Sequence, residues 1–299
     1  MLENALLDAI RIGYRHIDTG PYRNEGIVGR AIASAIGQGL VSREDLWLTG
    51  KLPTTCMDPS SVEPTLRKLL AELGTDYLDL YITHWPYALD PSSTASPPLM
   101  ECRRGYSPEA YLATWRAMEA CVDAGLVRSL GASNMTAKKL HHLLSAARIA
   151  PVVVQNEVHP ALAQTELLEF CRAKGMLLCG YCPLGSPGRP DLYRAPGDPD
   201  ILGDAVVKRV AEEVGRTPAQ VALKWALQRG TSPLPRSTNL ARIAENFAAG
   251  SADWELSEAH MRDLASLDCT ALSKGRIMKG VSRLPCQPYS PPPLLFHLP

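Results

Sequence analysis

Three side chains in the first part of the chain could together donate a proton. Tyr22 carries a phenol, Lys51 an ammonium and Asp18 a carboxylate. A phenol with its ordinary pKa of about 10 is a poor donor near neutral pH, but a close ammonium favours the phenolate and eases release of the proton. A nearby carboxylate keeps that ammonium charged where burial would favour its neutral form. His84 could add a ring nitrogen that hydrogen-bonds to the group being protonated.

These residues need elements that bring them together. Short apolar runs rich in β-formers alternate with segments of helical period, which is typical of parallel strands joined by crossover helices. The predicted strands are residues 16–18, 46–50, 78–83, 128–132, 152–156, 176–181 and 232–234. The predicted helices are residues 24–35, 62–73, 108–124, 137–147, 165–174, 203–214, 217–228, 240–247 and 257–267. Residues 90–106 and 183–199, which are rich in proline, are expected to be loops.

Polar residues gather at or just after the predicted strand ends. They are Asp18, Lys51, His84, Ser133, Asn134, Gln155, Tyr181 and Arg236. A parallel barrel places its active site at the carboxyl ends of its strands. An open doubly wound sheet does the same, but it normally has a glycine-rich turn after its first strand, and the sequence contains no G-x-G-x-x-G or Walker motif. We therefore predict an α/β fold of the (β/α)8 TIM-barrel type.

Several separated blocks resemble the aldo-keto reductase family. The first is residues 13–25 (GYRHIDTGPYRNE), which contains Asp18 and Tyr22. The others, in the family's order, are Lys51-Leu52 and residues 76–86 (DYLDLYITHWP), 131–134 (GASN), 155–160 (QNEVHP), 181–186 (YCPLGS) and 234–237 (LPRS). The resemblance covers roughly residues 5–270, and so many blocks in order are far more specific than any single one.

The resemblance implies an oxidoreductase that reduces aldehydes or ketones to alcohols by hydride transfer from NADPH. In such an enzyme Tyr22 would be the proton donor, assisted by Lys51, Asp18 and His84. His84 and Trp85 would also contact the substrate, a small carbonyl compound.

The resemblance also implies a cofactor site. Ser133, Asn134 and Gln155 would hold the nicotinamide carboxamide, Tyr181 would stack on the ring, and Leu184 and Ser186 would lie over the pyrophosphate. The adenosine end would meet Arg236, Ser237, Asn239, Arg242, Glu245 and Asn246. Two arginines suit a 2′-phosphate, which favours NADPH over NADH, although the family usually has lysine where Arg236 stands.

The sequence departs from the family in three further places. The chain begins inside the helix that normally follows the first barrel strand, so the barrel is expected to lack that strand. Tyr22 lies four residues after Asp18 where the family usually has five, and residues 280–299 form a divergent tail. These departures leave open a second hypothesis, a catalytically impaired or inactive barrel that binds nucleotide. A third hypothesis, thiol–disulfide exchange at residues 179–182 (CGYC), is disfavoured because the following Pro-Leu-Gly cannot easily begin a helix.

Composition narrows the class of protein. Lysine plus arginine and aspartate plus glutamate number 31 each, so the net charge is zero and no nucleic-acid or anionic-membrane partner is expected. The sequence shows neither a signal peptide nor an apolar run of about twenty residues. The eight cysteines are scattered, and no metal-site spacing is present. We expect a single domain over residues 1–299, monomeric and cytoplasmic.

Overall fold

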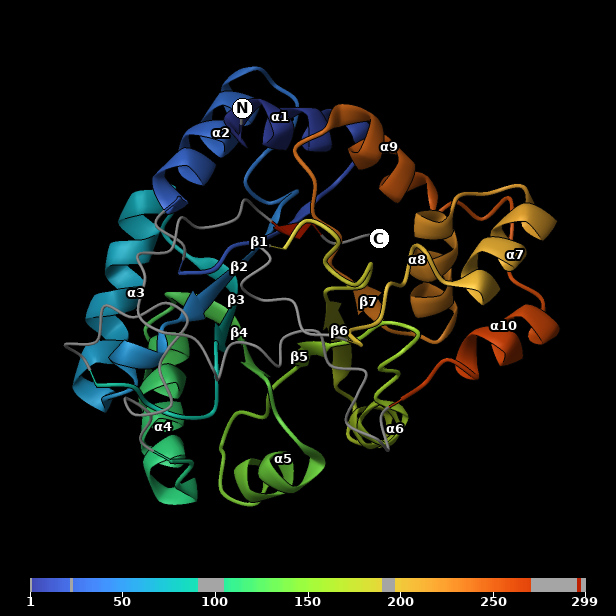
Figure 1. Ribbon diagram of the computed structural model, residues 1–299. Helices are drawn as coiled ribbons and strands as arrows, with labels where there is room; N and C mark the ends of the chain where they lie inside the picture. The colour runs from blue at the N-terminus through green and yellow to red at the C-terminus, as the bar shows by residue number, and fades with distance from the viewer. Residues whose placement is uncertain (1, 22–23, 91–104, 190–196, 270–294, 297–299) are drawn as a thin grey trace.

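A curled sheet of parallel strands forms the centre of the molecule. The computed structural model describes residues 2–21, 24–90, 105–189, 197–269 and 295–296. Within these ranges seven strands run parallel in the order β7-β6-β5-β4-β3-β2-β1 (Figure 1). They are β1 (His16–Asp18), β2 (Trp47–Leu52), β3 (Leu78–Thr83), β4 (Val127–Ser133), β5 (Val153–Glu157), β6 (Leu177–Tyr181) and β7 (Ser232–Pro233). The predicted strands are confirmed, with ends that differ by at most two residues.

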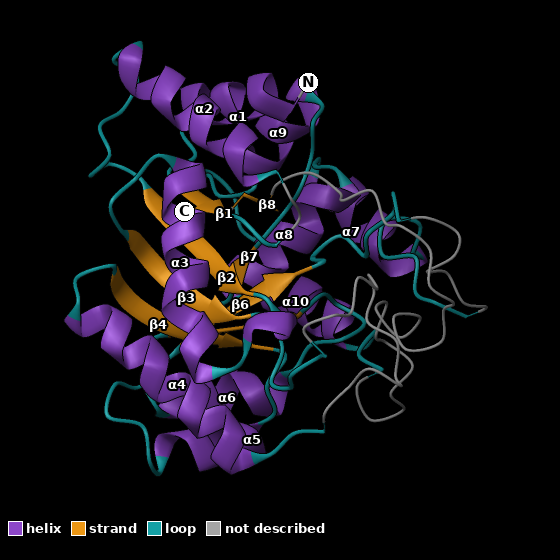
Figure 2. Cartoon of the chain, turned by 90° about the vertical axis from the view of Figure 1, so that its left-hand side faces the viewer, coloured by secondary structure: helices purple, strands orange, loops and turns teal. Residues whose placement is uncertain are grey.

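Helices surround the sheet on its outer face (Figure 2). They are α1 (Leu2–Ile12), α2 (Glu25–Gly37), α3 (Pro59–Leu73), α4 (Pro108–Asp123), α5 (Ala137–Leu144), α6 (Thr165–Ala173), α7 (Ala205–Val214), α8 (Pro218–Gln228), α9 (Leu240–Ala248) and α10 (Glu258–Ala265). A 3-10 turn, η1 (Thr54–Cys56), follows β2. Among the described residues no helix is long and apolar enough to cross a membrane. The arrangement is that of a (β/α)8 barrel with one parallel strand missing, as the sequence predicted.

The gap in the sheet lies between β7 and β1. A two-residue strand from the tail, β8 (Leu295–Phe296), lies beside β1 (Figure 2). It pairs antiparallel with β1, with Ile17 opposite Phe296. No motif in the sequence predicted this strand. The outer layer continues across the gap because α1 contacts α9, where the ring of Phe247 packs edge-on against that of Tyr14 at 4.9 Å. An open strand edge exposes unpaired backbone N–H and C=O groups. By pairing with β1, β8 satisfies some of the groups that the missing strand leaves unpaired.

Two apolar layers position the strands. Inside the curled sheet, a small cluster consists of Leu80, Ile82, Val153, Cys179 and Leu234. Outside, a large cluster packs the strands against the helices and includes the fully buried Trp115 and Trp225. Burying a side chain of this size contributes roughly 5 kcal/mol of hydrophobic free energy, before its ordering cost.

Gly131 shows how closely the inner layer is packed. A Cβ at this position would lie 2.5 Å from the Cγ2 atom of Ile82 and 2.9 Å from the carbonyl oxygen of Val153. Only glycine therefore lets β3, β4 and β5 keep their spacing here.

Local capping fixes most helix ends. Ser257 caps α10 in a reciprocal capping box. Glycines in the left-handed conformation follow α3, α4 and α6 at Gly74, Gly125 and Gly175. The prediction for α3 was three residues too short, because the side chain of Asp58 accepts from Ser60 N–H and starts the helix, with Pro59 at its first position.

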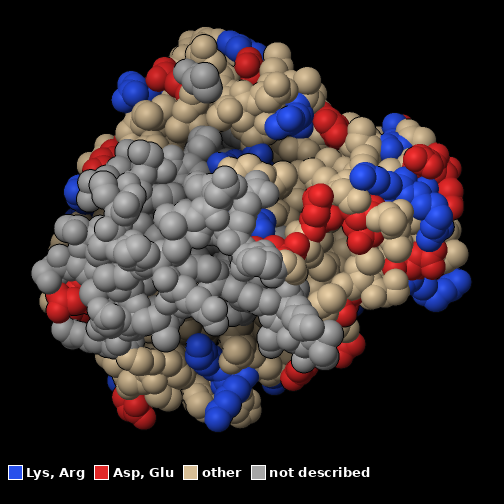
Figure 3. All heavy atoms as spheres, viewed as in Figure 1, with Lys and Arg blue, Asp and Glu red and all other residues tan. Residues whose placement is uncertain are grey.

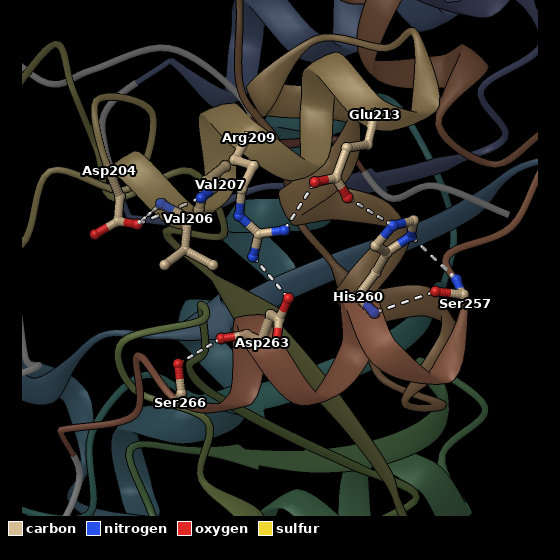
Figure 4. Close-up of polar contacts among 9 residues, drawn as sticks. All are labelled: Asp204, Val206, Val207, Arg209, Glu213, Ser257, His260, Asp263 and Ser266. Carbon is tan, nitrogen blue, oxygen red and sulfur yellow. Dashed lines mark hydrogen bonds and ion pairs between the residues drawn. The ribbon is translucent and has the colours of Figure 1, made fainter.

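A polar network joins α7 to α10 near the end of the described chain (Figure 4). Arg209 of α7 donates to Asp263 of α10 at 2.6 Å and to Glu213 at 2.9 Å, and Glu213 also contacts His260 Nε2 at 3.1 Å. Charges of both signs are mixed over these two helices on the visible face (Figure 3). The network therefore joins α10 to α7.

A second charged cluster lies toward the amino ends of β2, β3 and β4. The buried carboxylate of Asp79 accepts from Arg43 at 2.9 Å, from Leu48 N–H at 2.9 Å and from Arg128 at 3.1 Å. Both guanidinium groups also lie over the ring of Tyr77, at 3.9 and 4.1 Å from its centroid. Because this end of a barrel is typically the stabilising one, we interpret the cluster as structural.

Candidate active site

The centre of the candidate site is a buried ion pair between neighbouring strands. Asp18 ends β1, Lys51 lies on β2, and the register pairs Asp18 with Thr49, so both side chains enter the sheet's inner face. Lys51 Nζ donates to Asp18 Oδ1 and to the carbonyl oxygen of Thr19, the latter at 3.1 Å. Asp18 is 1% exposed and Lys51 4%. Burying two charges usually adds little to stability, so such a pair at the carboxyl ends of the strands suggests a function.

A third buried group completes the centre from across the barrel. Gln155 Nε2 of β5 donates to Asp18 Oδ2 at 2.8 Å, although β5 lies four places from β1 in the sheet. The main-chain oxygen of Gln155 accepts from Ser133 Oγ at 2.6 Å and from Asn134 N–H at 3.0 Å. Gln155 therefore links the ion pair to the end of β4.

His84 follows β3 and is held through its backbone. Its N–H donates to the carbonyl oxygen of Leu52 at 3.1 Å, and its own carbonyl accepts from Asn134 Nδ2 at 2.9 Å. The pKa of the imidazole is lowered to about 3, mainly by desolvation and also by the positive charge of Lys51, while Asp18 partly opposes both effects. His84 is consequently neutral near pH 7 and can donate one ring N–H without carrying charge.

Asn134 connects two further members of the predicted site. Its Oδ1 accepts from the hydroxyl of Tyr181 at 2.7 Å, and its Nδ2 also lies 3.2 Å from Ser133 Oγ. Tyr181 ends β6, and its ring joins the rim of the inner apolar cluster. One chain of hydrogen bonds thus runs through the predicted residues Lys51, Asp18, Gln155, Ser133, Asn134, His84 and Tyr181.

Backbone strain gathers around this network. Among the described residues, four that are not glycine have a positive φ, and three of these lie at or after the ends of β4 and β6: Asn134 at 60°, Cys182 at 54° and Ser186 at 49°. Such conformations cost about 1 kcal/mol or more, and they concentrate at functional sites in proteins. Their location therefore supports the same place for the site.

The segment after β6 is turned back by local contacts. Ser186 Oγ donates to Cys182 Sγ at 2.9 Å, and Leu184 packs against the apolar core. Burial raises the pKa of the Cys182 thiol to about 12, and it raises that of Cys179 well above its ordinary value. Thiol exchange requires a thiolate, so the raised pKa values argue against the dithiol hypothesis for residues 179–182.

The residues predicted for the adenosine end lie around the start of α9. Asn239 caps this helix by accepting from Arg242 N–H at 3.1 Å, and Ser237 Oγ accepts from Asn239 N–H at 3.0 Å. Arg236 and Arg242 are both exposed. This arrangement leaves cations and a helix amino terminus on one surface, which suits a phosphate.

Two other residues predicted for the adenosine end take part in packing. The carboxylate of Glu245 accepts from Thr217 Oγ1 at 2.5 Å, and its main-chain oxygen accepts from Gln220 at 3.2 Å. Asn246 is buried. Glu245 therefore helps to join α9 to α8, and the contact of Glu245 and Asn246 with an adenine stays a prediction.

Two predicted substrate contacts lie together, and one central residue is not described. The ring of Trp85 lies 6.4 Å from that of His84 and 5.6 Å from that of Tyr87, which the sequence interpretation had not selected. Tyr22 falls outside the described residues. The sequence also contains no pattern that predicts the contact between Gln155 and Asp18, because residues so far apart in the chain become neighbours only when the barrel curls.

Among the described residues no group of three or more His, Cys, Asp or Glu side chains could hold a metal ion.

Comparisons with known proteins all find members of one family. The model of the aldo/keto reductase family matches residues 2–268. An aldo/keto reductase of Synechocystis sp. is 42% identical over 265 residues, which cover 88% of this chain and 80% of that protein. Aldo-keto reductase family 1 member A1 of Bos taurus is 42% identical over 266 residues, 88% of this chain and 81% of its own length. Aldo-keto reductase family 4 member C11 of Arabidopsis thaliana is 43% identical over 245 residues, 82% and 75% of the two chains.

Proposed function

The chain belongs to the aldo/keto reductase family, and we propose that it reduces aldehydes and ketones with NADPH, using Tyr22 as the proton donor. Family membership makes it an oxidoreductase that acts on small carbonyl compounds. The observation that carries the finer proposal is the buried Lys51–Asp18 pair at the carboxyl ends of the strands, beside a neutral His84.

Each member of the proposed catalytic set has a separate task. The ammonium of Lys51 stabilises the phenolate that Tyr22 becomes as it gives its proton to the carbonyl oxygen. Asp18 holds that ammonium in place and keeps it charged inside the barrel. His84, neutral and anchored by Leu52 and Asn134, donates a hydrogen bond that orients the carbonyl oxygen.

The residues present fit a dinucleotide phosphate. The amides of Asn134 and Gln155 and the hydroxyl of Ser133 form one polar group, next to the ring of Tyr181. Ser133, Asn134 and Gln155 would hold the carboxamide, Tyr181 would stack on the nicotinamide, and Leu184 and Ser186 would lie along the pyrophosphate. Arg236, Ser237, Asn239 and Arg242 would receive the 2′-phosphate. When bound, the dinucleotide supplies the hydride.

One observation favours a second candidate, a barrel that binds the dinucleotide without turnover. In the described part of the chain, the position between β7 and β1 holds a short antiparallel strand instead of a parallel one. A small displacement of the loop after β1 would move Tyr22, and catalytic groups tolerate only about 0.5 Å.

Two measurements separate these candidates. NADPH binding is followed by fluorescence titration, and NADPH oxidation is followed with a panel of aromatic and aliphatic aldehydes. The proposal expects binding and turnover in the wild type, and binding with turnover reduced by at least about a hundredfold in Tyr22→Phe.

The matched control is Tyr77→Phe, which removes a buried hydroxyl from the opposite end of the sheet. This variant should keep the wild-type rate. Binding without turnover in the wild type would establish the second candidate, and full activity in Tyr22→Phe would exclude Tyr22 as the donor.

A further inference from the structure

Gln155 makes a contact that cofactor binding alone does not require. Its Nε2 lies 2.8 Å from Asp18 Oδ2, while Lys51 binds the other oxygen of the same carboxylate. We infer that Gln155 is a positioning residue that keeps Asp18 ionised and so couples recognition of the nicotinamide carboxamide to the charge of Lys51. This inference rests on the proposed function.

The orientation of the Gln155 amide follows from its partner. An ionised carboxylate only accepts hydrogen bonds, so the group directed at Asp18 must be the NH2. Oε1 therefore lies on the other branch of the amide. The residue cannot easily turn, because its main-chain oxygen is held by Ser133 and Asn134 and its strand is paired on both sides.

An oriented amide has a consequence for ligand recognition. Oε1 is an acceptor, and a carboxamide offers N–H donors that an acetyl group or a carboxylate lacks. Gln155 should therefore distinguish a nicotinamide dinucleotide from analogues altered at that group. Loss of the donor would leave a polar atom poorly satisfied at a buried site, which is the usual basis of strong discrimination.

The same amide acts on the ion pair. A hydrogen bond to the charged form of an acid favours that form, and this one reaches a carboxylate buried in the barrel. The titratable groups that act on Asp18 include Lys51, His84 and Cys179, and none of them changes in a Gln155 variant. Without the Gln155 hydrogen bond, Asp18 should protonate at a higher pH, and a protonated Asp18 no longer supports the ammonium of Lys51. The acid limb of the activity profile should then move upward by about one pH unit.

Two substitutions separate this role from a simple ligand contact. Gln155→Met keeps the length of the side chain and removes both polar groups. Gln155→Glu keeps the shape, and its protonated form can donate to Asp18 while its ionised form repels it. Met should shift the acid limb of kcat/KM upward, whereas Glu should reduce kcat/KM as the pH rises.

The first readout uses protein without nucleotide. The carboxyl of Asp18 is followed by NMR in chains labelled with 13C-aspartate, and its signal is assigned from its loss in Asp18→Asn. We expect the Asp18 titration midpoint to rise by about one unit in Gln155→Met. An unchanged midpoint would overturn the positioning role.

The second readout compares the affinities for NADPH and for its reduced 3-acetylpyridine analogue. Wild type should prefer the carboxamide by roughly tenfold or more, and Gln155→Met should lose that preference. An equal preference in both proteins would overturn the coupling.

Failure of the proposed function gives a different pattern. Wild-type protein would then not oxidise NADPH, and the kcat/KM profiles could not be measured. If it still bound NADPH, the affinity comparison with the 3-acetylpyridine analogue would test the coupling. The Asp18 titration would still decide whether Gln155 positions the ion pair. If Gln155→Met does not fold, Gln155→Glu decides through the sign of its pH dependence.

Discussion

The depressed pKa of His84 should appear in the stability of the protein as well as in its chemistry. The native imidazole titrates at about 3, mainly because burial disfavours its charged form and because Lys51 repels a second cation. In the unfolded chain it should titrate near 6.5. Between these two values the unfolded state binds a proton that the native state does not, so the free energy of unfolding falls as the pH decreases from 6.5 toward 3.

The size of the effect follows from this linkage. Lowering the pH from 7 to 5 should remove about 2 kcal/mol of stability through His84 alone. The result hardly depends on the native value as long as that value stays below about 4, because at pH 5 the native ring is then almost wholly neutral.

The assay compares wild type with His84→Gln, which cannot titrate at this position. Urea unfolding of both proteins at pH 7 and pH 5 gives the free energy of unfolding, and all other titrating groups cancel in the difference. Wild type should lose about 2 kcal/mol more than the variant. Parallel losses in the two proteins, or an NMR titration of native His84 near pH 6.5, would refute the reasoning.

Two further predictions concern the opposite end of the barrel and the cofactor's phosphate. Asp79→Asn should lower the free energy of unfolding by about 3 kcal/mol, because two guanidinium groups lose their buried counter-charge, while kcat of the folded protein stays within about twofold of wild type. Chemical denaturation measures the loss of stability, and a turnover assay measures kcat. A stability loss below about 1 kcal/mol would contradict the structural interpretation of this cluster. Arg242→Ala should weaken NADPH binding about tenfold and leave NADH binding nearly unchanged, because only NADPH carries the 2′-phosphate. Fluorescence titration measures both affinities. Equal weakening of NADPH and NADH binding would show that Arg242 does not contact the 2′-phosphate.

Most of the fold follows from local sequence patterns. The strand 78–83 and the helix from Pro108 were predicted with little error because apolar periodicity, capping residues and terminal glycines agree there. β8 was not predicted, because Leu295–Phe296 lies in a proline-rich tail whose pairing with β1 depends on a gap elsewhere in the sheet. Long-range pairing of this kind leaves no local signal.

The candidate site was predicted in a similar way. The sequence predicted Asp18, Lys51 and His84 at strand ends, because the strands and the polar residues that follow them could both be recognised in the sequence. The hydrogen bond from Gln155 to Asp18 was not predicted, because it forms only when the curled sheet brings distant strands together. The low pKa of His84 was not predicted either, because it depends on how the folded sheet excludes water.

The most direct test of the central claim is transfer of the hydride itself. NADPH deuterated at both hydrogens of C4 of the nicotinamide is incubated with the protein and an aromatic aldehyde, and the alcohol is analysed by mass spectrometry. We expect one deuterium on the carbinol carbon of each alcohol molecule formed, and almost none in Tyr22→Phe over the same time. If NADPH binds yet the panel of aldehydes yields no deuterated alcohol, the protein is not the reductase proposed here.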